Sequence, residues 1–148
     1  MKNMKMSKRY GSHLPVLMEF VNATTGKVLE LGCGLYSTPY LYWFAGDRFV
    51  SYETDSEWHD RMRQYGVKYV QNYNQIEPDK FSVALIDHAP AERRIVDIMQ
   101  LKDCVDFFIL HDYRDASYNY EKIYPHFKYR KNYAHLNTTV ISNIYEII

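Results

Sequence analysis

The sequence has few cysteines, no net charge and no long apolar run. Its two cysteines, Cys33 and Cys104, are too few for a disulfide framework or a four-thiolate zinc site. Eighteen basic residues balance eighteen acidic ones, which argues against a strongly basic nucleic-acid-binding protein. No uncharged run approaches the roughly 18 residues of a membrane span, so we expect no membrane partner. The basic N-terminus lacks a following apolar stretch, so we expect no secretory signal and a cytoplasmic location.

The remaining composition is that of one folded domain. A chain of 148 residues falls within the usual size of a single domain, about 100–200 residues. The sequence shows no repeat, no low-complexity segment and no linker rich in proline or glycine, so we expect one domain over residues 1–148. Fifteen tyrosines are a surplus, which we interpret as a half-buried rim of the core, with a ring-stacking surface as the alternative.

The apolar pattern alternates between helical and strand periods along the chain. Apolar spacing predicts helices over residues 13–21, 37–45, 56–65, 91–101 and 118–124, the second with Ser37 as its N-cap. Buried or alternating apolar runs predict strands over residues 27–31, 48–53, 67–71, 81–86 and 105–110, and a hairpin from residues 127–135 and 139–144. Because parallel neighbours need crossover connections, this order predicts an α/β fold with a doubly wound, mostly parallel sheet and a C-terminal antiparallel hairpin.

Candidate binding residues follow the first three predicted strands, and ligands of such sheets bind beyond the carboxyl ends of the strands. Gly32 and Gly34 permit a sharp turn and a close approach of a ligand to the backbone. Glu53 ends the second strand, where an acid can accept hydrogen bonds from both hydroxyls of a ribose. Thr54 is close enough to flank an adenine ring, and Asn72 follows the third strand. Turn glycines and solvated strand-end acids without a ligand remain the alternatives.

Acids and imidazoles follow the fourth and fifth predicted strands. Asp87 and His88 come after the fourth strand, and His111 and Asp112 come after the fifth. We expect them to converge on one cleft, as an acid/base or metal site whose imidazoles titrate near neutral pH. Aspartate and histidine at strand ends also serve as ordinary helix caps and turn formers, which is the structural alternative.

The sequence resembles the class I S-adenosylmethionine-dependent methyltransferases. Residues 28–34, VLELGCG, are similar to the glycine-rich first motif of that family, E/D-x-G-x-G. Residues 53–58 are similar to its E-x-D-x-x-W segment, and residues 34–38 are similar to the G-x-Y-S-T run of small O-methyltransferases. The resemblance covers about residues 8–144. It implies a Rossmann-like sheet and S-adenosylmethionine as the cofactor.

The resemblance also implies residue roles. Glu30 orients the methionine amino group through water or backbone, Gly32 and Gly34 approach the sugar and the methionine, and Glu53 holds the ribose. The full set of expected cofactor-binding residues is Glu30, Gly32, Gly34, Glu53, Thr54, Asn72, Asp87 and His88.

For function, we expect methyl transfer to an unidentified acceptor, a small-molecule hydroxyl above all. Asp87, His111 and Asp112 are the candidate catalytic residues that would take the acceptor's proton. The strand ends LIDH and LHDY are similar to metal-site strand ends of catechol-type O-methyltransferases. However, Pro90 and Tyr113 stand where those enzymes have a catalytic lysine and an asparagine ligand, so no metal ion is predicted.

Several alternatives stay open. The short acceptor region favours a non-catalytic or degenerate cofactor-binding subunit, and the spacing of Gly32, Gly34 and Ser37 is one residue from the dinucleotide pattern of NAD-type oxidoreductases. The basic stretch 122–131 is a possible nucleic-acid contact, with a solvated hairpin face as the alternative. Residues 10–13 are candidates to fold over the cofactor, and a homodimer is an open alternative to a monomer.

Overall fold

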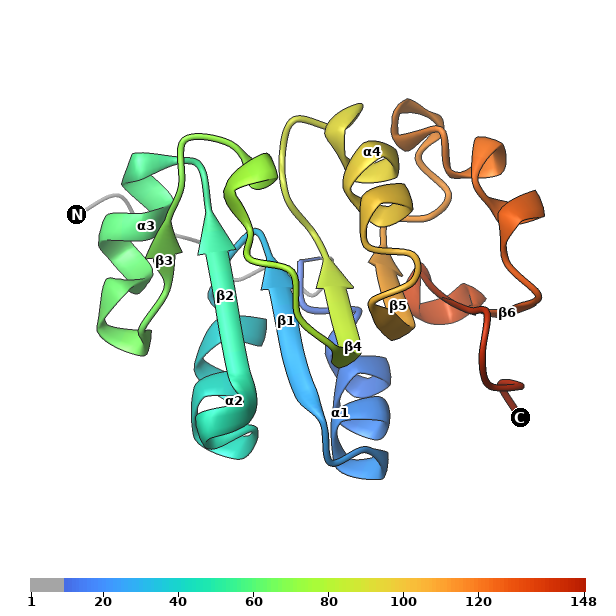
Figure 1. Cartoon of the computed structure of the whole chain (residues 1–148), viewed down its shortest axis with the longest axis horizontal. Helices are drawn as coiled ribbons and strands as arrows, with labels where there is room; N and C mark the ends of the chain where they lie inside the picture. The colour runs from blue at the N-terminus through green and yellow to red at the C-terminus, as the bar shows by residue number, and fades with distance from the viewer. Residues whose placement is uncertain (1–9) are drawn as a thin grey trace.

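A seven-stranded sheet with helices on both faces forms the centre of the molecule (Figure 1). The computed structural model describes residues 10–148. The strands are β1 (Lys27–Leu31), β2 (Phe49–Glu53), β3 (Lys68–Tyr69), β4 (Phe81–Ile86), β5 (Val105–His111), β6 (Tyr129–Tyr133) and β7 (Thr138–Ser142). The α-helices are α1 (Leu14–Ala23), α2 (Ser37–Phe44), α3 (Ser56–Met62) and α4 (Arg93–Gln100).

The strand order is β3-β2-β1-β4-β5-β7-β6, and the first five strands in the chain are parallel. β7 runs antiparallel to both β5 and β6. The direction of winding reverses between β1 and β4, and ligands of such sheets bind beyond the carboxyl ends of the strands at this switch point. The predicted α/β sheet, doubly wound and mostly parallel with a terminal antiparallel hairpin, is confirmed.

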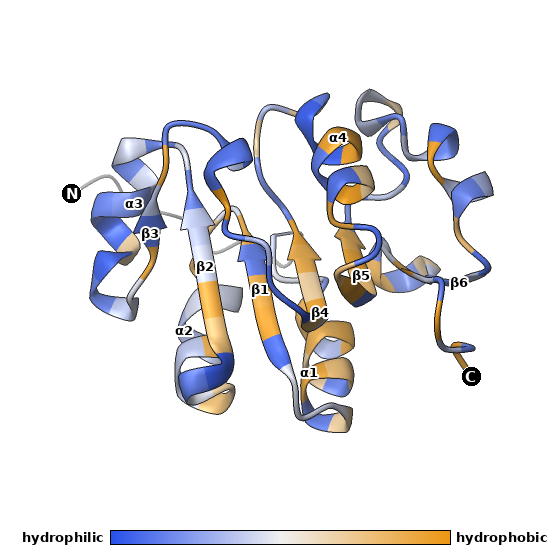
Figure 2. Ribbon diagram, viewed as in Figure 1, coloured by the Kyte–Doolittle hydropathy of each residue, from blue (hydrophilic) through white to orange (hydrophobic). Residues whose placement is uncertain are grey.

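Alternation along the buried strands gives the sheet two apolar faces. Val28 packs with α1 and α2 on one face, and the next residue, Leu29, packs on the opposite face with α4. Val83 and Ala84 of β4 divide in the same way. Figure 2 shows the hydrophobic middle of β1 and β4 in the centre of the sheet. Because the parallel strands carry apolar side chains on both faces of the sheet, helices must cover both faces.

Two local predictions are wrong. Ser37 is not the N-cap of α2, because Tyr36 holds that position and the Ser37 hydroxyl donates to Glu30 Oε1 at 2.6 Å instead. The helix expected over residues 118–124 is replaced by short 3₁₀ turns at Ala116–Tyr118, Tyr120–Lys122 and Tyr124–His126. Asn119, with φ of 55°, adopts the left-handed conformation between the first two turns and prevents a continuous α-helix there.

Other elements are shorter than expected. The strand predicted at residues 67–71 is reduced to two paired residues, and the helix predicted at residues 56–65 ends in a 3₁₀ turn at Arg63–Tyr65. Gly66 closes that turn with φ of 74°, a conformation that favours glycine. No helix within residues 10–148 is both long and apolar enough to cross a lipid bilayer.

Candidate functional site

The turn between β1 and α2 contains two glycines with different surroundings. Gly32 has φ of 87°, and a Cβ placed on it would lie 2.6 Å from the Cα of His88. Its lack of a side chain therefore lets the backbone after β1 touch the backbone after β4. Apart from its chain neighbours, a Cβ on Gly34 would meet only Ser37 Oγ, at 3.8 Å, among the atoms of the described residues within 4 Å. Gly34 therefore leaves open space at the carboxyl end of β1.

Glu30 of β1 is fully buried and lies on the interior side of this turn. Its carboxylate accepts hydrogen bonds from the hydroxyls of Ser37 at 2.6 Å, Ser51 at 2.6 Å and Thr38 at 2.9 Å. Burial raises the pKa of Glu30 to about 7, and the three hydroxyl hydrogen bonds oppose that rise. Thr38 Oγ1 in turn accepts the N–H of Gly34 at 2.8 Å. Glu30 thus reaches the glycine turn through Thr38.

Glu53 joins the glycine turn to the loop after β2. Its Oε2 accepts the N–H of Cys33 at 2.9 Å, and its Oε1 accepts the N–H groups of Thr54 and Asp55, both at 2.8 Å. The side chain is 6% exposed. A carboxylate offers about four lone pairs, and the Cys33 thiol also hydrogen-bonds to this one, so an outside donor would compete with the weak thiol donor. The adjacency of the glycine turn and Glu53 is the arrangement that a ribose site requires.

Asn72 lies beyond β3 on the same side of the sheet and is exposed. Its side-chain oxygen accepts the N–H of Asn74 at 3.0 Å and so caps the 3₁₀ turn at Tyr73–Gln75. The Tyr73 ring in this turn is buried against the ring of His88, with 4.4 Å between centroids. Asn72 thus has a structural contact of its own, and its predicted cofactor role stays a prediction.

The ends of β4 and β5 bring Asp87 and His111 together. Asp87 Oδ1 lies 3.1 Å from His111 Nδ1 and accepts a hydrogen bond from Arg94 Nη2, also at 3.1 Å. Burial acts to raise the pKa of Asp87. The hydrogen bond to His111 and the charges of His111, His13 and Arg94 act in the opposite direction and are stronger, so the pKa of Asp87 is lowered. Burial acts to lower the pKa of His111, but the hydrogen bond and charge of Asp87 outweigh it and raise that pKa.

Asp112 completes this group. Its Oδ1 lies 3.6 Å from His111 Nε2 and accepts a hydrogen bond from Asn137 Nδ2 at 2.8 Å. Its backbone has φ of 56°, which turns the chain sharply at the end of β5. The structure therefore brings together Asp87, His111 and Asp112, the three candidate catalytic residues.

His88 points away from that group, although it follows Asp87 directly. Its Nε2 lies 2.8 Å from Asp97 Oδ2 on α4, and Arg93 donates to the same carboxylate at 2.6 Å. Burial lowers the pKa of His88, and the hydrogen bond to Asp97 opposes that change. His88 therefore links the loop after β4 to helix α4.

Arg94 is a residue of the site that the sequence reasoning did not identify. It is buried and donates to the carbonyl of His88 at 2.7 Å, the carbonyl of His111 at 3.2 Å and the hydroxyl of Tyr120 at 3.2 Å. Its guanidinium also stacks on the Tyr118 ring at 3.9 Å. Arg94 thus fixes the ends of β4 and β5 beside each other. The sequence did hold one signal that Arg94 faces the core, because Arg94 lies four residues before Ile98 and therefore on the same face of α4.

The segment before α1 also reaches this group. Ser12 Oγ lies 3.0 Å from His111 Nε2, and the ring of His13 meets the ring of His111 edge-on, with 4.5 Å between centroids. His13 is 1% exposed. Residues 10–13 had been expected near the cofactor, but a role for His13 itself had not been predicted.

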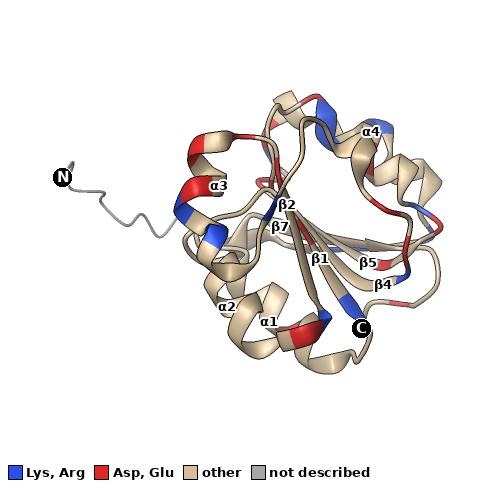
Figure 3. Ribbon diagram, turned by 60° about the vertical axis from the view of Figure 1, so that its left-hand side comes forward, with Lys and Arg blue, Asp and Glu red and all other residues tan. Residues whose placement is uncertain are grey.

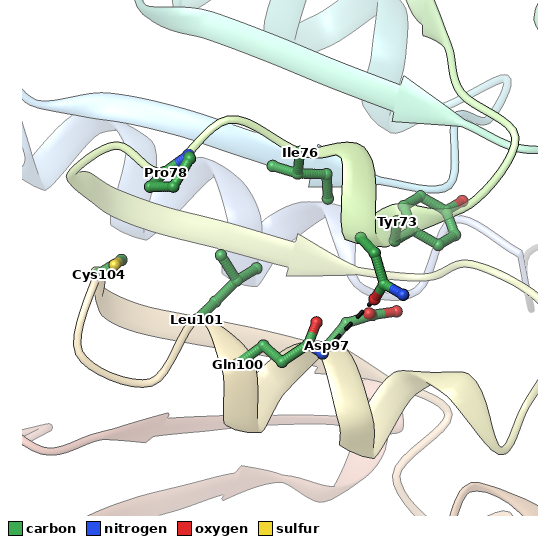
Figure 4. A pocket seen from close by; sticks show the side chains of 8 residues that line it. Tyr73, Ile76, Pro78, Asp97, Gln100, Leu101 and Cys104 are labelled. Atoms are coloured by element: carbon green, nitrogen blue, oxygen red, sulfur yellow. Dashed lines mark hydrogen bonds between the residues drawn. The ribbon is translucent and has the colours of Figure 1, made fainter.

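A small pocket of about 170 Å³ lies beside β4, between α4 and the segment that follows β3 (Figure 4). It is lined by Tyr73, Asn74, Ile76, Pro78, Asp97, Gln100, Leu101 and Cys104. Pockets for ligands of drug size usually measure about 300–1,000 Å³, so this pocket is too small for a whole nucleoside cofactor. None of the predicted site residues lines this pocket, whose walls come from the segment after β3, from α4 and from the turn that follows α4.

No protein-family model matches the sequence, and no curated protein matches it in sequence. Solved structures do share its fold. MtNAS in complex with S-adenosylmethionine matches with a TM-score of 0.54 and 14% identity, over 89% of this chain and 61% of that one. The METTL16 MTase domain matches with a TM-score of 0.54 and 12% identity, over 88% of this chain and 66% of that one.

Thermoplasma acidophilum 1320 matches with a TM-score of 0.56 and 11% identity, over 93% of this chain and 89% of that one. The chain spans less than two thirds of the first two of these proteins. At such low identities the likeness concerns the fold alone. The fold is the Rossmann-like fold of class I methyltransferases, and the prediction of that fold is confirmed.

Proposed function

We propose that this chain is an S-adenosylmethionine-dependent methyltransferase that acts on a hydroxyl of a small molecule. The observation that carries the proposal is the contact between the glycine turn and Glu53, in which Cys33 N lies 2.9 Å from Glu53 Oε2. This contact lies at the switch point of a sheet whose fold is shared with MtNAS, a protein solved with S-adenosylmethionine.

The residues at the switch point fit the proposed cofactor. Gly34 presents an open backbone face, and the carboxylate of Glu53 can accept a ribose hydroxyl in place of the weakly donating Cys33 thiol. Thr54 and Asn72 border the place where the adenine would lie, by their positions after β2 and β3. Gly32 and Glu30 support this surface from inside the protein. When bound, the cofactor would supply an activated methyl group.

The group at the ends of β4 and β5 supplies the acid/base chemistry in this proposal. A hydroxyl acceptor must lose a proton as it takes the methyl group. Asp87 is held in its ionised form by Arg94 and His111, and Asp112 provides a second carboxylate 3.6 Å from His111. A positioned base of this kind contributes roughly 10²–10⁴-fold to a rate. The rest of the acceleration would come from holding the acceptor in line with the methyl group.

Calorimetric titration with S-adenosylhomocysteine tests cofactor binding. We expect Glu53→Gln to weaken binding by about 10–100-fold, because a hydrogen bond to a charged acceptor contributes about 1.5–3 kcal/mol. The matched control is Glu57→Gln on α3, where both signs of charge lie side by side and Glu57 pairs with Arg61 on the surface (Figure 3). Equal affinity in the two variants would remove Glu53 from the ribose role.

Two further measurements separate the proposal from its alternatives. Titration with NADH would show binding if the chain were instead an NAD-type oxidoreductase. In a working methyl-transfer assay, Asp87→Asn and Asp112→Asn should lower kcat with little effect on S-adenosylhomocysteine affinity. Cofactor binding without methyl transfer to any hydroxyl compound would favour the alternative of a non-catalytic subunit.

A further inference from the structure

We infer that His13, Asp87 and His111 form a binding site for one divalent transition-metal ion of the Zn²⁺ or Co²⁺ class. Each of the three side chains offers one ligand atom, and these atoms all lie within 4.8 Å of one another. Two imidazoles and one carboxylate are an established ligand set for catalytic zinc and for non-haem iron. The inference goes beyond the proposed methyl transfer, since the ion can bind whether or not that function holds.

The first support comes from His13, which is buried and has no visible partner for its ring nitrogens. Among residues 10–148, neither Nδ1 nor Nε2 of His13 has a hydrogen-bond partner. A buried polar atom left unpaired costs about 1–3 kcal/mol, so such atoms need an explanation.

The second support is the arrangement of the ring and the carboxylate around it. His111 Nδ1 and Asp87 Oδ1 are 3.1 Å apart, close to the roughly 3.4 Å between neighbouring ligands of a tetrahedral ion with bonds of about 2.1 Å. Arg94 Nη2 also donates to Asp87 Oδ1, and this contact helps to fix the carboxylate beside His111. The His13 ring stands edge-on to His111, at an interplanar angle of 61°.

The backbone holds His13 in this position. The carbonyl of His13 accepts the N–H of Leu17 at 3.0 Å, so the residue forms the first turn of α1. Leu17 is fully buried under the sheet, which anchors the turn. His13 thus belongs to the backbone framework of α1, which holds its ring within reach of Asp87 and His111.

The donor set decides which ions fit. Nitrogen ligands favour zinc, cobalt and nickel, whereas magnesium and calcium prefer oxygen ligands only. Asp112 does not belong to this group of ligand atoms, and its Oδ1 accepts a hydrogen bond from Asn137. The site therefore differs from the carboxylate pair Asp87 and Asp112 that the sequence alone had brought to attention. In the loaded protein, Asp112 is the carboxylate left to take a proton from an acceptor.

Cobalt binding tests the inference directly. Chelator-treated wild-type protein is titrated with Co²⁺, and visible absorption bands should rise to a plateau at one equivalent. His13→Ala should weaken Co²⁺ binding by at least about tenfold, since even residues that only support a metal ligand contribute about 10–100-fold. The matched control is His126→Ala, which removes an exposed histidine outside the cluster and should leave the titration unchanged.

A second measurement does not depend on a variant that folds. X-ray absorption on wild-type protein loaded with Zn²⁺ should show two imidazole ligands. One imidazole or none, or a Co²⁺ affinity that is equal in His13→Ala and His126→Ala, overturns the inference. Titration of the same wild-type samples with S-adenosylhomocysteine keeps the two proposals apart. Cofactor binding without Co²⁺ binding refutes the ion site alone, and Co²⁺ binding without cofactor binding refutes the proposed function alone.

Discussion

Glu30 makes the stability of this protein depend on pH in an unusual direction. Burial raises the pKa of its carboxyl from 4.5 to about 7 in the folded chain. The folded state therefore binds the proton more tightly than the unfolded state does between these two pH values. Because unfolding releases a proton in this window, the contribution of Glu30 to stability is lost as pH rises from 4.5 to about 7.

The size of this effect follows from the shift. One pKa unit corresponds to 1.36 kcal/mol, so a rise from 4.5 to about 7 corresponds to about 3 kcal/mol. Glu30 is fully buried, so solvent does not screen this term. Domains are typically stable by about 5–15 kcal/mol, and a loss of about 3 kcal/mol is a large part of that total.

Glu30→Gln isolates the effect because glutamine stays neutral at every pH. The hydroxyls of Ser37, Thr38 and Ser51 can each donate or accept, so they can reorient around the amide. We expect the variant to match the wild type near pH 4 and to be more stable by roughly 1–3 kcal/mol above pH 8. Glu57→Gln, a change of an exposed carboxylate, is the control.

Urea unfolding followed by circular dichroism, from about pH 4 to about pH 9, measures these differences. The informative quantity is the free energy of unfolding of Glu30→Gln minus that of the wild type at each pH. It should rise through the window and then level off, while the same difference for Glu57→Gln stays flat. A difference for Glu30→Gln that does not change with pH would refute the reasoning, because Glu30 would then titrate alike in the folded and unfolded states.

Two further predictions concern the framework of the site. Arg94→Met should destabilise the chain by about 3–5 kcal/mol in urea unfolding. The change removes the cation that faces Asp87, and it leaves the carbonyl groups of His88 and His111 without their donor. A cost below about 1 kcal/mol would contradict this role of Arg94. Gly32→Ala and Gly66→Ala both place a side chain at positive φ. At Gly32 the Cβ would lie 2.6 Å from the Cα of His88, whereas at Gly66 it would meet no atom of the described residues within 4 Å apart from its chain neighbours. Gly66→Ala should cost about 1 kcal/mol and Gly32→Ala distinctly more, and equal melting temperatures for the two variants would show that the close approach at Gly32 is not required.

The parts of the fold that the sequence predicted are those with strong local signals. β4 is a continuous apolar run, and the structure has it over the predicted residues, Phe81–Ile86. The region after β5 was harder, because residues 118–124 form separate 3₁₀ turns in which Tyr118 stacks on Arg94 and Tyr120 accepts a hydrogen bond from it. Their tertiary contacts with a buried cation outweighed a weak local preference for helix.

The candidate site shows the same division between local and long-range signals. Strand-end positions drew attention to Glu53, Asp87 and His111, since the carboxyl ends of parallel strands meet at one edge. The partners that occupy these side chains were not visible in the sequence. The three backbone N–H groups on Glu53 depend on the conformation of two loops, and the Arg94 contact with Asp87 depends on how α4 rotates over the sheet.

The position of His13 could have been derived, because it follows from topology and lengths. A helix that packs on the sheet and leads directly into β1 runs opposite to that strand, so the helix begins at the carboxyl edge of the sheet. α1 has 10 residues and spans about 15 Å at 1.5 Å per residue, and a five-residue strand such as β1 spans about 17 Å. The start of α1 therefore reaches the strand ends, and α1 packs on β4 and β5. Any imidazole at that start meets the residues after those strands, and this accounts for the contact between His13 and His111 across 98 positions of sequence.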